Sequence, residues 1–244
     1  MDQNMIAQFL ALAGVDRAQR AFRKLSQHDT SRWALTGRLA IEYHCLRHGV
    51  RSMLGNLNDI DFVASAFDHI PGTLAHDYLF RHIHPLDPPN KTLIQFVDTD
   101  CALRVDVFRT TDQVMRRAEH VDLGFGPIAV VSLEDMTARS ARLAMSVAEG
   151  KPVAPKHVTD YLRLVEIADL DKLETAWEDH RRPTDPIVFH EIQSLLQGLI
   201  PARPDLQIPT VHSRNTTTVC PRCASVPPLQ LADPSTVLSV LDYC

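Results

Sequence analysis

The sequence predicts an α+β fold, with a mixed β-sheet and flanking helices followed by a helical domain and an irregular tail. Period-two alternation of polar and apolar residues, which is typical of strands, occurs in the first half of the chain. After residue 132 the apolar residues recur at helical spacing, and beyond residue 201 prolines interrupt a segment with little periodicity. We therefore expect an α/β domain over residues 1–131, a helical domain over 132–200 and a proline-rich tail over 201–244.

The composition is typical of a soluble globular protein and excludes several other classes. The chain has 244 residues, of which 45% are hydrophobic and 23% charged, and its formal net charge is -5. No stretch approaches the ~20 consecutive apolar residues of a membrane span, and the N-terminus lacks the features of a signal peptide. We therefore expect a cytoplasmic protein with no membrane contact, in which nucleic-acid binding would require a local basic patch.

In the first half, short periodic segments alternate between helix and strand. Helical spacing predicts a hairpin of two helices over residues 3–13 and 16–26, and a strand over 33–37 leads through a glycine turn into a buried helix that ends near Gly49. Further strands are expected over 58–63, 92–97, 102–108 and 128–131, with a helix-like stretch over 72–82 and an irregular loop over 84–90.

The second half reads as helical throughout. Ser132, followed three residues later by an acid, favours a helix start. Apolar spacing then predicts helices over residues 133–149, 156–168, 171–180 and 186–199.

Two acids in one strand are the sharpest chemical signal. Asp59 and Asp61 lie two residues apart, so both carboxylates project from the same face of the strand while Ile60 and Phe62 project from the other. Like charges this close repel unless a cation lies between them. Carboxylate oxygens are the ligands that Mg²⁺ prefers, so the pair favours a divalent metal site.

Two further features extend this candidate site. Asp106 lies in an apolar strand, opposite to its buried residues, and would reach the same ion if the two strands pair. Three acids on two strands can hold two metal ions about 3.5–4 Å apart, as in phosphoryl-type transfer. Upstream, Gly37 ends a strand just before a helix, where backbone N–H groups can bind an anion. Each feature alone is commonly a surface acid or a simple turn; their order in the chain favours a functional site.

In that order the motifs resemble the nucleotidyltransferase superfamily, the DNA polymerase β-like group, and within it the AbiEii-type toxin-like transferases. The matching segments are residues 35–42 (LTGRLAIE), 58–62 (NDIDF), 104–108 (RVDVF), 131–135 (VSLED) and 156–162 (KHVTDYL). The resemblance covers about residues 33–167 and implies a nucleotidyltransferase-like sheet followed by helices.

The resemblance also implies roles for individual residues. Asp59 and Asp61 would bind Mg²⁺ or Mn²⁺, and Asp106 would complete the metal site and help to deprotonate the attacking hydroxyl. Gly37 would lie against the phosphates of the nucleotide. Lys156 would either contact phosphate or be an ordinary solvated lysine near a helix start.

Arg38 departs from the family pattern, which has a small residue after the glycine. Its guanidinium would either supply charge to a triphosphate or block the pocket, as in a noncatalytic member. An active member would move a nucleoside monophosphate from an NTP such as ATP to a hydroxyl of RNA, tRNA or protein, and a toxin-like member would have a cognate antitoxin. The alternatives are an inactive nucleotide-binding or partner-binding protein and a transferase that modifies a small antibiotic.

Other polar clusters carry weaker signals. Cys220 and Cys223 have the spacing of a zinc knuckle, which His212 and Cys244 could complete; the alternative is reduced thiols in the tail. Two histidines near residue 83 could form a metal pair, although an exposed loop is the simpler interpretation. Basic residues early in the helical half form either a patch for an RNA acceptor or an ordinary solvated face; they are Arg139, Arg142, Lys151, Lys156 and Arg163.

Overall fold

The computed structural model describes residues 12–53, 57, 59–83, 93–98, 100–101, 103–123, 126–151 and 154–203. The strands are β1 (Ala34–Thr36), β2 (Asp59–Ala64), β3 (Tyr78–Ile83), β4 (Leu93–Asp98), β5 (Arg104–Arg109), β6 (Glu119–Asp122) and β7 (Pro127–Val130). The helices are α2 (Leu12–Leu25), α3 (Gly37–Arg47), α4 (Asp112–Arg117), α5 (Leu133–Ala148), α6 (Lys156–Val165), α7 (Leu170–His180) and α8 (Phe189–Leu199), with short 3-10 helices at Phe67–His69 and Gly72–His76. Within these ranges, no helix combines the length and apolarity needed to cross a membrane.

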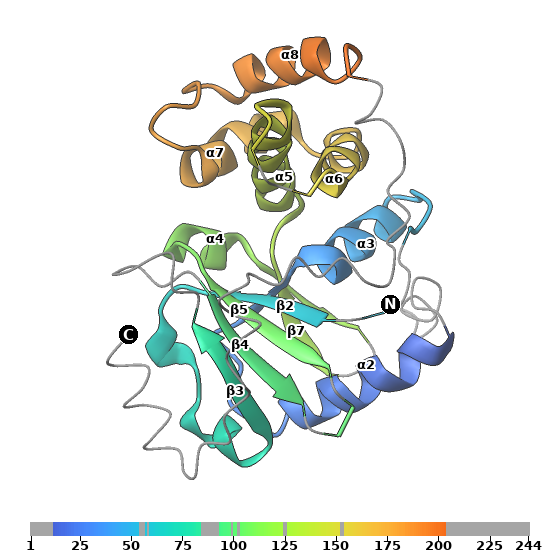
Figure 1. Ribbon diagram of the computed structural model, residues 1–244, viewed down its shortest axis with the longest axis vertical. Coiled ribbons are helices and arrows are strands. Elements are labelled where there is room, and N and C mark those ends of the chain that lie inside the picture. Colours follow the sequence, from blue (N-terminus) through green and yellow to red (C-terminus); the bar gives the residue numbers. More distant parts are fainter. Residues whose placement is uncertain are drawn as a thin grey trace.

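The strands form one mixed sheet in the order β3-β4-β5-β2-β1-β7-β6 (Figure 1). Strand β2 pairs in parallel with β5, and β1 pairs in parallel with β7, while the other neighbours are antiparallel. The parallel pairing of β2 and β5 is the part that matters for function, because it places the two acid-bearing strands side by side.

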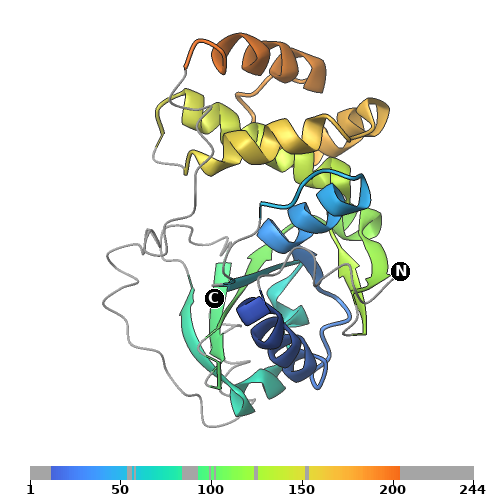
Figure 2. The same ribbon diagram turned by 90° about the vertical axis from the view of Figure 1, so that its right-hand side faces the viewer.

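Helix α2 covers the face of the sheet that carries the apolar residues of β2 (Figure 2). The ring of Phe22 in α2 lies edge-on to that of Phe62, with their centroids 6.4 Å apart, and Trp33 packs on Phe62 at 5.4 Å. Since alternate strand residues face opposite sides, this packing leaves the acids of β2 on the other face, toward α3 and the helical half.

Helices α5 to α8 gather beyond α3, at one end of the sheet (Figure 1). Small residues on α5 are fully buried and let the neighbouring helices approach closely: Ala138, Ala141 and Ala144. Trp177 of α7 is also fully buried in this second core, where its ring packs on Phe189. The described residues after residue 132 form only helices and loops, so secondary structure changes where the sequence predicts; the division into two domains stays a proposal.

Most predicted elements are present, and the exceptions have physical causes. The helix-like stretch over 72–82 is wrong in its second part, because Tyr78–Ile83 forms strand β3, which pairs with β4 and buries Tyr78. Helix α4 and edge strand β6 were not expected; both are short, and β6 alternates only half-buried with exposed positions. The turn of the predicted N-terminal hairpin, between residues 13 and 16, is wrong, because helix α2 runs without a break over Leu12–Leu25; the residues before Leu12 lie outside the described range.

Candidate active site

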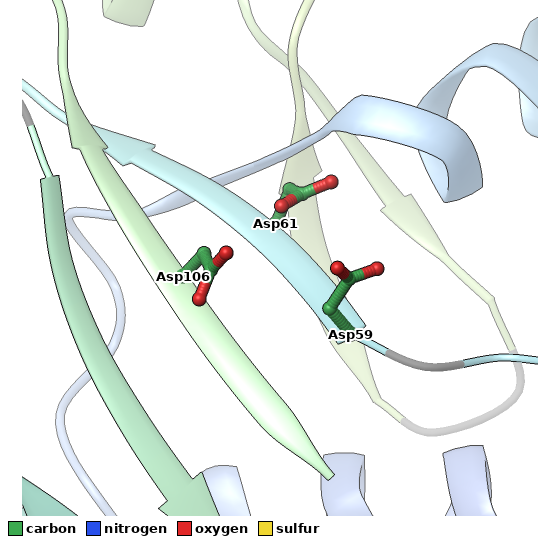
Figure 3. Close-up of side chains that lie close together, drawn as sticks. All are labelled: Asp59, Asp61 and Asp106. Atoms are coloured by element: carbon green, nitrogen blue, oxygen red, sulfur yellow. The ribbon is translucent and has the colours of Figure 1, made fainter. Parts of the chain in front are cut away.

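Four polar side chains form one row across the centre of the sheet. The strand register pairs Thr36 of β1 with Asp61 of β2, Asp61 with Asp106 of β5, and Asp106 with Gln95 of β4. Paired residues on neighbouring strands point to the same face. Asp59 lies two residues before Asp61 and therefore joins the same face (Figure 3).

The three carboxylates meet as the strand pattern predicts. One oxygen from each of Asp59, Asp61 and Asp106 lies within 4.8 Å of the others. Burial and the charges of Asp59 and Asp106 raise the pKa of Asp61 above its ordinary value. Burial also raises the pKa of Asp106 to about 6, although Arg104 opposes this shift. The cluster therefore carries repelling negative charge, which a cation would relieve.

Arg104 already supplies part of that positive charge. It lies opposite Asp59 in the parallel register, and its guanidinium forms ion pairs with both Asp59 and Asp106, the latter at 2.9 Å. No role for Arg104 was evident from the sequence, because its position beside Asp59 depends on the register between two strands that lie far apart in the chain.

Gly37 begins helix α3 in direct contact with the acids. Its φ is +63°, a left-handed conformation that side-chain-bearing residues rarely adopt, and a Cβ atom here would lie 2.0 Å from Oδ2 of Asp61. Glycine is therefore required at this position for two reasons: the left-handed backbone of the turn and the close approach of Asp61. The N-terminus of α3 consequently opens directly beside the carboxylates.

Arg38 is held by buried acids. Its Nε lies 3.0 Å from Glu42 Oε1, its Nη1 lies 2.9 Å from Asp160 Oδ1 of α6, and its Nη2 donates to the carbonyl of Met53 at 2.7 Å. Two carboxylates thus share its charge. The contact of Arg38 with a nucleotide phosphate, like that of Gly37, stays a prediction.

The carboxylates open into a cleft of about 360 Å³ between the sheet and helices α3, α5 and α6. Its basic side is formed by Lys156, Arg104 and Arg139, and Gly37 and Arg38 line it as well. Burial and the charges of Lys156 and Arg139 lower the pKa of His157 to about 3, so this lining imidazole is neutral. Acids that suit a metal and cations that suit an anion therefore face one cavity.

Several predicted sites fall elsewhere. Cys220, Cys223 and the other candidate zinc ligands lie outside the described residues, as does His84. Of the basic residues grouped from the sequence, Arg163 does not line the cleft and pairs with buried Glu42 at 2.8 Å. The predicted N-cap is present, because the Ser132 hydroxyl accepts a hydrogen bond from the Asp135 amide.

No protein-family model matches the sequence, and no curated protein does so. The chain is similar to solved structures of nucleotidyltransferase-like proteins. An antigenic nucleotidyltransferase-like protein from Paracoccidioides brasiliensis is 15% identical, with a TM-score of 0.39, over 81% of this chain and 92% of that one. The antibiotic-resistance factor ANT(2'')-Ia is 12% identical, with a TM-score of 0.43, over 77% of this chain and 95% of that one. The Megavirus polyadenylate synthase is 12% identical, with a TM-score of 0.44, over 62% of this chain and 31% of that one. These identities and TM-scores are low, so any statement about function rests on the site itself.

Proposed function

We propose that this protein is a metal-dependent nucleotidyltransferase that moves a nucleoside monophosphate from an NTP to an acceptor hydroxyl. The observation that carries the proposal is the convergence of Asp59, Asp61 and Asp106 beside a helix N-terminus, in a cleft that also holds cationic side chains. Carboxylates alone would suit many metal ions. The cationic side chains and the helix N-terminus beside them favour a metal ion that is bound together with a polyphosphate.

The donor set fits Mg²⁺ or Mn²⁺. All three candidate ligands are carboxylate oxygens, which hard divalent cations prefer, and their mutual repulsion falls when a cation binds. When bound, the metal would polarise the phosphate and neutralise charge on the attacking and leaving oxygens. Asp59 and Asp61 would hold it, and Asp106 would complete the ligand set.

The remaining groups would bind and orient the substrates. Lys156 and Arg139 would hold the phosphates, and the N-terminal amides of α3 would add hydrogen bonds made possible by Gly37. The acceptor oxygen bonds to the α-phosphorus while the bond from that phosphorus to the bridging oxygen breaks, and pyrophosphate leaves. The acceptor proton passes to a carboxylate oxygen of Asp106, which lies beside the other two candidate metal ligands.

The test is transfer of label from α-³²P-labelled NTPs, with Mg²⁺ or Mn²⁺, to cellular RNA, to protein or to small hydroxylated acceptors. We expect Asp106→Asn to lower transfer by at least about a hundredfold, because an amide neither binds the metal well nor accepts the proton. The matched control is Asp68→Asn, at a side chain that is 76% exposed and does not line the cleft. Equal rates of label transfer by the wild type, Asp106→Asn and Asp68→Asn would overturn the proposal.

A second candidate is a nucleotide-binding protein without transferase activity. The position of Arg104 on two of the three carboxylates favours it, since this guanidinium occupies ligand oxygens that a metal would need. NTP binding that requires Asp59 and Asp61, without transfer to any acceptor, would support this candidate. A cognate antitoxin, and so a toxin role, would be sought by co-purification with the intact chain.

A further inference from the structure

A second, larger cleft adjoins the carboxylate cleft. It has a volume of about 690 Å³ and lies between the end of β5, helix α5 and the segment that follows α7. Phe108 and Arg139 line both cavities, so the two lie side by side. We call it the arginine cleft after the side chains that dominate its lining: Arg109, Arg139, Arg142, Arg181 and Arg182.

The acid that lines the arginine cleft is already neutralised. Asp179 pairs with Arg117 at 2.7 Å and accepts a hydrogen bond from the Thr111 hydroxyl at 3.1 Å. Arg182, in turn, pairs with Asp185 at 2.7 Å. Within the described part of the chain, no carboxylate lies within ion-pair distance of the other four arginines.

Arg139, Arg142 and Arg181 are partly buried, and keeping their charges there without an anion costs free energy of folding. Within the described residues, the buried Nε atoms of Arg142 and Arg181 have no hydrogen-bond partner. Burial lowers the pKa of both Arg139 and Arg142, and the neighbouring charge of Arg182 lowers that of Arg142 further. A folded protein that keeps several guanidinium groups partly desolvated and unpaired has a surface suited to a ligand with several negative charges.

We propose that the arginine cleft binds the phosphates of a single-stranded nucleic acid, whose terminal hydroxyl reaches the carboxylates as the acceptor. The proposal rests on the proposed function, and it selects nucleic acid from the acceptors considered there. Beside Arg139, which stacks on Phe108 and is assigned above to the NTP, three arginines without an ion pair lie on three segments: Arg109 of β5, Arg142 of α5 and Arg181 after α7. Three separated cations match several phosphates better than one. The volume lies within the range of pockets for compact ligands, about 300–1,000 Å³, which is enough for the end of a single strand. A cationic acceptor, such as an aminoglycoside, would be repelled.

The test measures binding of fluorescein-labelled eight-nucleotide single strands of RNA and DNA to the full chain by fluorescence anisotropy, with chelator and without NTP. We expect the double variant Arg142→Gln/Arg181→Gln to bind at least about tenfold more weakly. The slope of log affinity against log salt concentration should fall by about 0.7 for each phosphate that the variant no longer neutralises. Arg23→Gln, at an exposed arginine on α2 across the sheet, is the matched control and should bind as the wild type does.

Binding of NTP with Mn²⁺, measured on the same proteins by calorimetry, separates this inference from the proposed function. NTP binding that depends on Asp61, without oligonucleotide binding, would overturn the inference and leave the function standing. Loss of NTP binding in the arginine variants, with oligonucleotide binding intact, would assign the cleft to the triphosphate and also overturn it. Transfer of label to a protein acceptor, with none to nucleic acid, would also overturn the inference. Oligonucleotide binding that depends on the arginines but persists in Asp61→Asn would support it even if transfer fails.

Discussion

At the scale of single residues, Gly37 is the described glycine whose substitution meets both a steric clash and a strained backbone. Its substitution by alanine adds a Cβ atom that collides with Asp61 and also strains a backbone at φ +63°. Gly49 separates the two effects, because its φ is +74° but nothing lies within 4 Å of a Cβ built there.

We therefore expect Gly49→Ala to cost about 1–2 kcal/mol of stability, from the left-handed backbone alone, and Gly37→Ala to cost more, because its Cβ also collides with Asp61. Only Gly37→Ala should also lower nucleotidyl transfer, by about a hundredfold, because it displaces a metal-binding carboxylate by roughly an ångström. Urea denaturation and initial rates of label transfer measure the two effects. Equal rates for the two variants would contradict the close packing of Gly37 on Asp61.

If the carboxylates bind a divalent metal as proposed, Arg104 competes with it for them. Replacing it by methionine removes a positive charge from two candidate ligands, Asp59 and Asp106. We expect Arg104→Met to bind Mn²⁺ at least about tenfold more tightly, since a unit charge leaves a partly buried site, and to be less stable without metal. Calorimetric titration with Mn²⁺ measures the affinity. Arg47→Met, at a half-exposed ion pair with Glu119, should leave it unchanged; weaker metal binding by Arg104→Met would contradict the competition.

At the scale of elements, one buried ion network joins α3 to α6. Glu42 of α3 is fully buried and accepts from Arg163 of α6 through both carboxylate oxygens, at 2.8 and 3.0 Å. Burial alone would raise the pKa of Glu42, but Arg163 and Arg38 hold it below its ordinary value. These ion pairs thereby connect α3, which begins at Gly37, to α6, which begins at Lys156.

Removing one partner of a buried ion pair costs about 3–5 kcal/mol when the other charge is left alone, and we expect Arg163→Met to cost somewhat less than that, because Arg38 still pairs with Glu42 at 3.0 Å. The control is Lys172→Met, which removes a surface pair whose side chains are 71% and 46% exposed and should cost no more than about 1 kcal/mol. Urea denaturation of both variants gives the comparison. A loss of similar size in the two would mean that the network adds little.

Local patterns in the sequence predicted most elements and the position of the acids, because both depend on residues close in the chain. Alternation in residues 58–63 and 102–108 was enough to place Asp59, Asp61 and Asp106 on defined strand faces. Strand β3 was mistaken in part for helix, since its pairing with β4 decided its conformation. The ion pairs of Arg104 and the arginine cleft depend on contacts between distant segments, which periodicity does not report.

At the scale of the whole molecule, a net charge of -5 conceals a strong separation of charge. The acids of β2 and β5 and the arginines of the adjoining cleft share one side of the sheet, while α2 packs on the other. An average over the chain therefore says little about the field that a substrate meets. It is the local field, positive beside negative, that suits a metal and a phosphate chain together.

The stability of the folded chain should fall on mild acidification partly through His157. Its pKa of about 3 lies far below the ordinary value near 6.5, because burial and nearby cations oppose its protonation. As pH falls below about 6.5, the unfolded chain gains a proton there that the folded chain does not, so folding becomes less favourable. We expect His157→Gln to lose less stability than the wild type between about pH 7.5 and 5, measured by urea denaturation.

The exposed His190 of α8 provides the control for that experiment. His190→Gln should lose as much stability as the wild type over the same pH interval. An identical loss in His157→Gln would show that the buried imidazole does not contribute to acid sensitivity.

The parallel pairing of β2 with β5 also has a consequence for how the chain folds. Asp59 and Arg104 meet across 45 residues, and the strands β3 and β4 lie between them in sequence but at one side in the sheet. Contacts between such distant residues form only after a large loop closes, which slows folding. We therefore expect the carboxylate cluster to form only once the central sheet is assembled, and a partly synthesised chain that ends before β5 lacks Asp106.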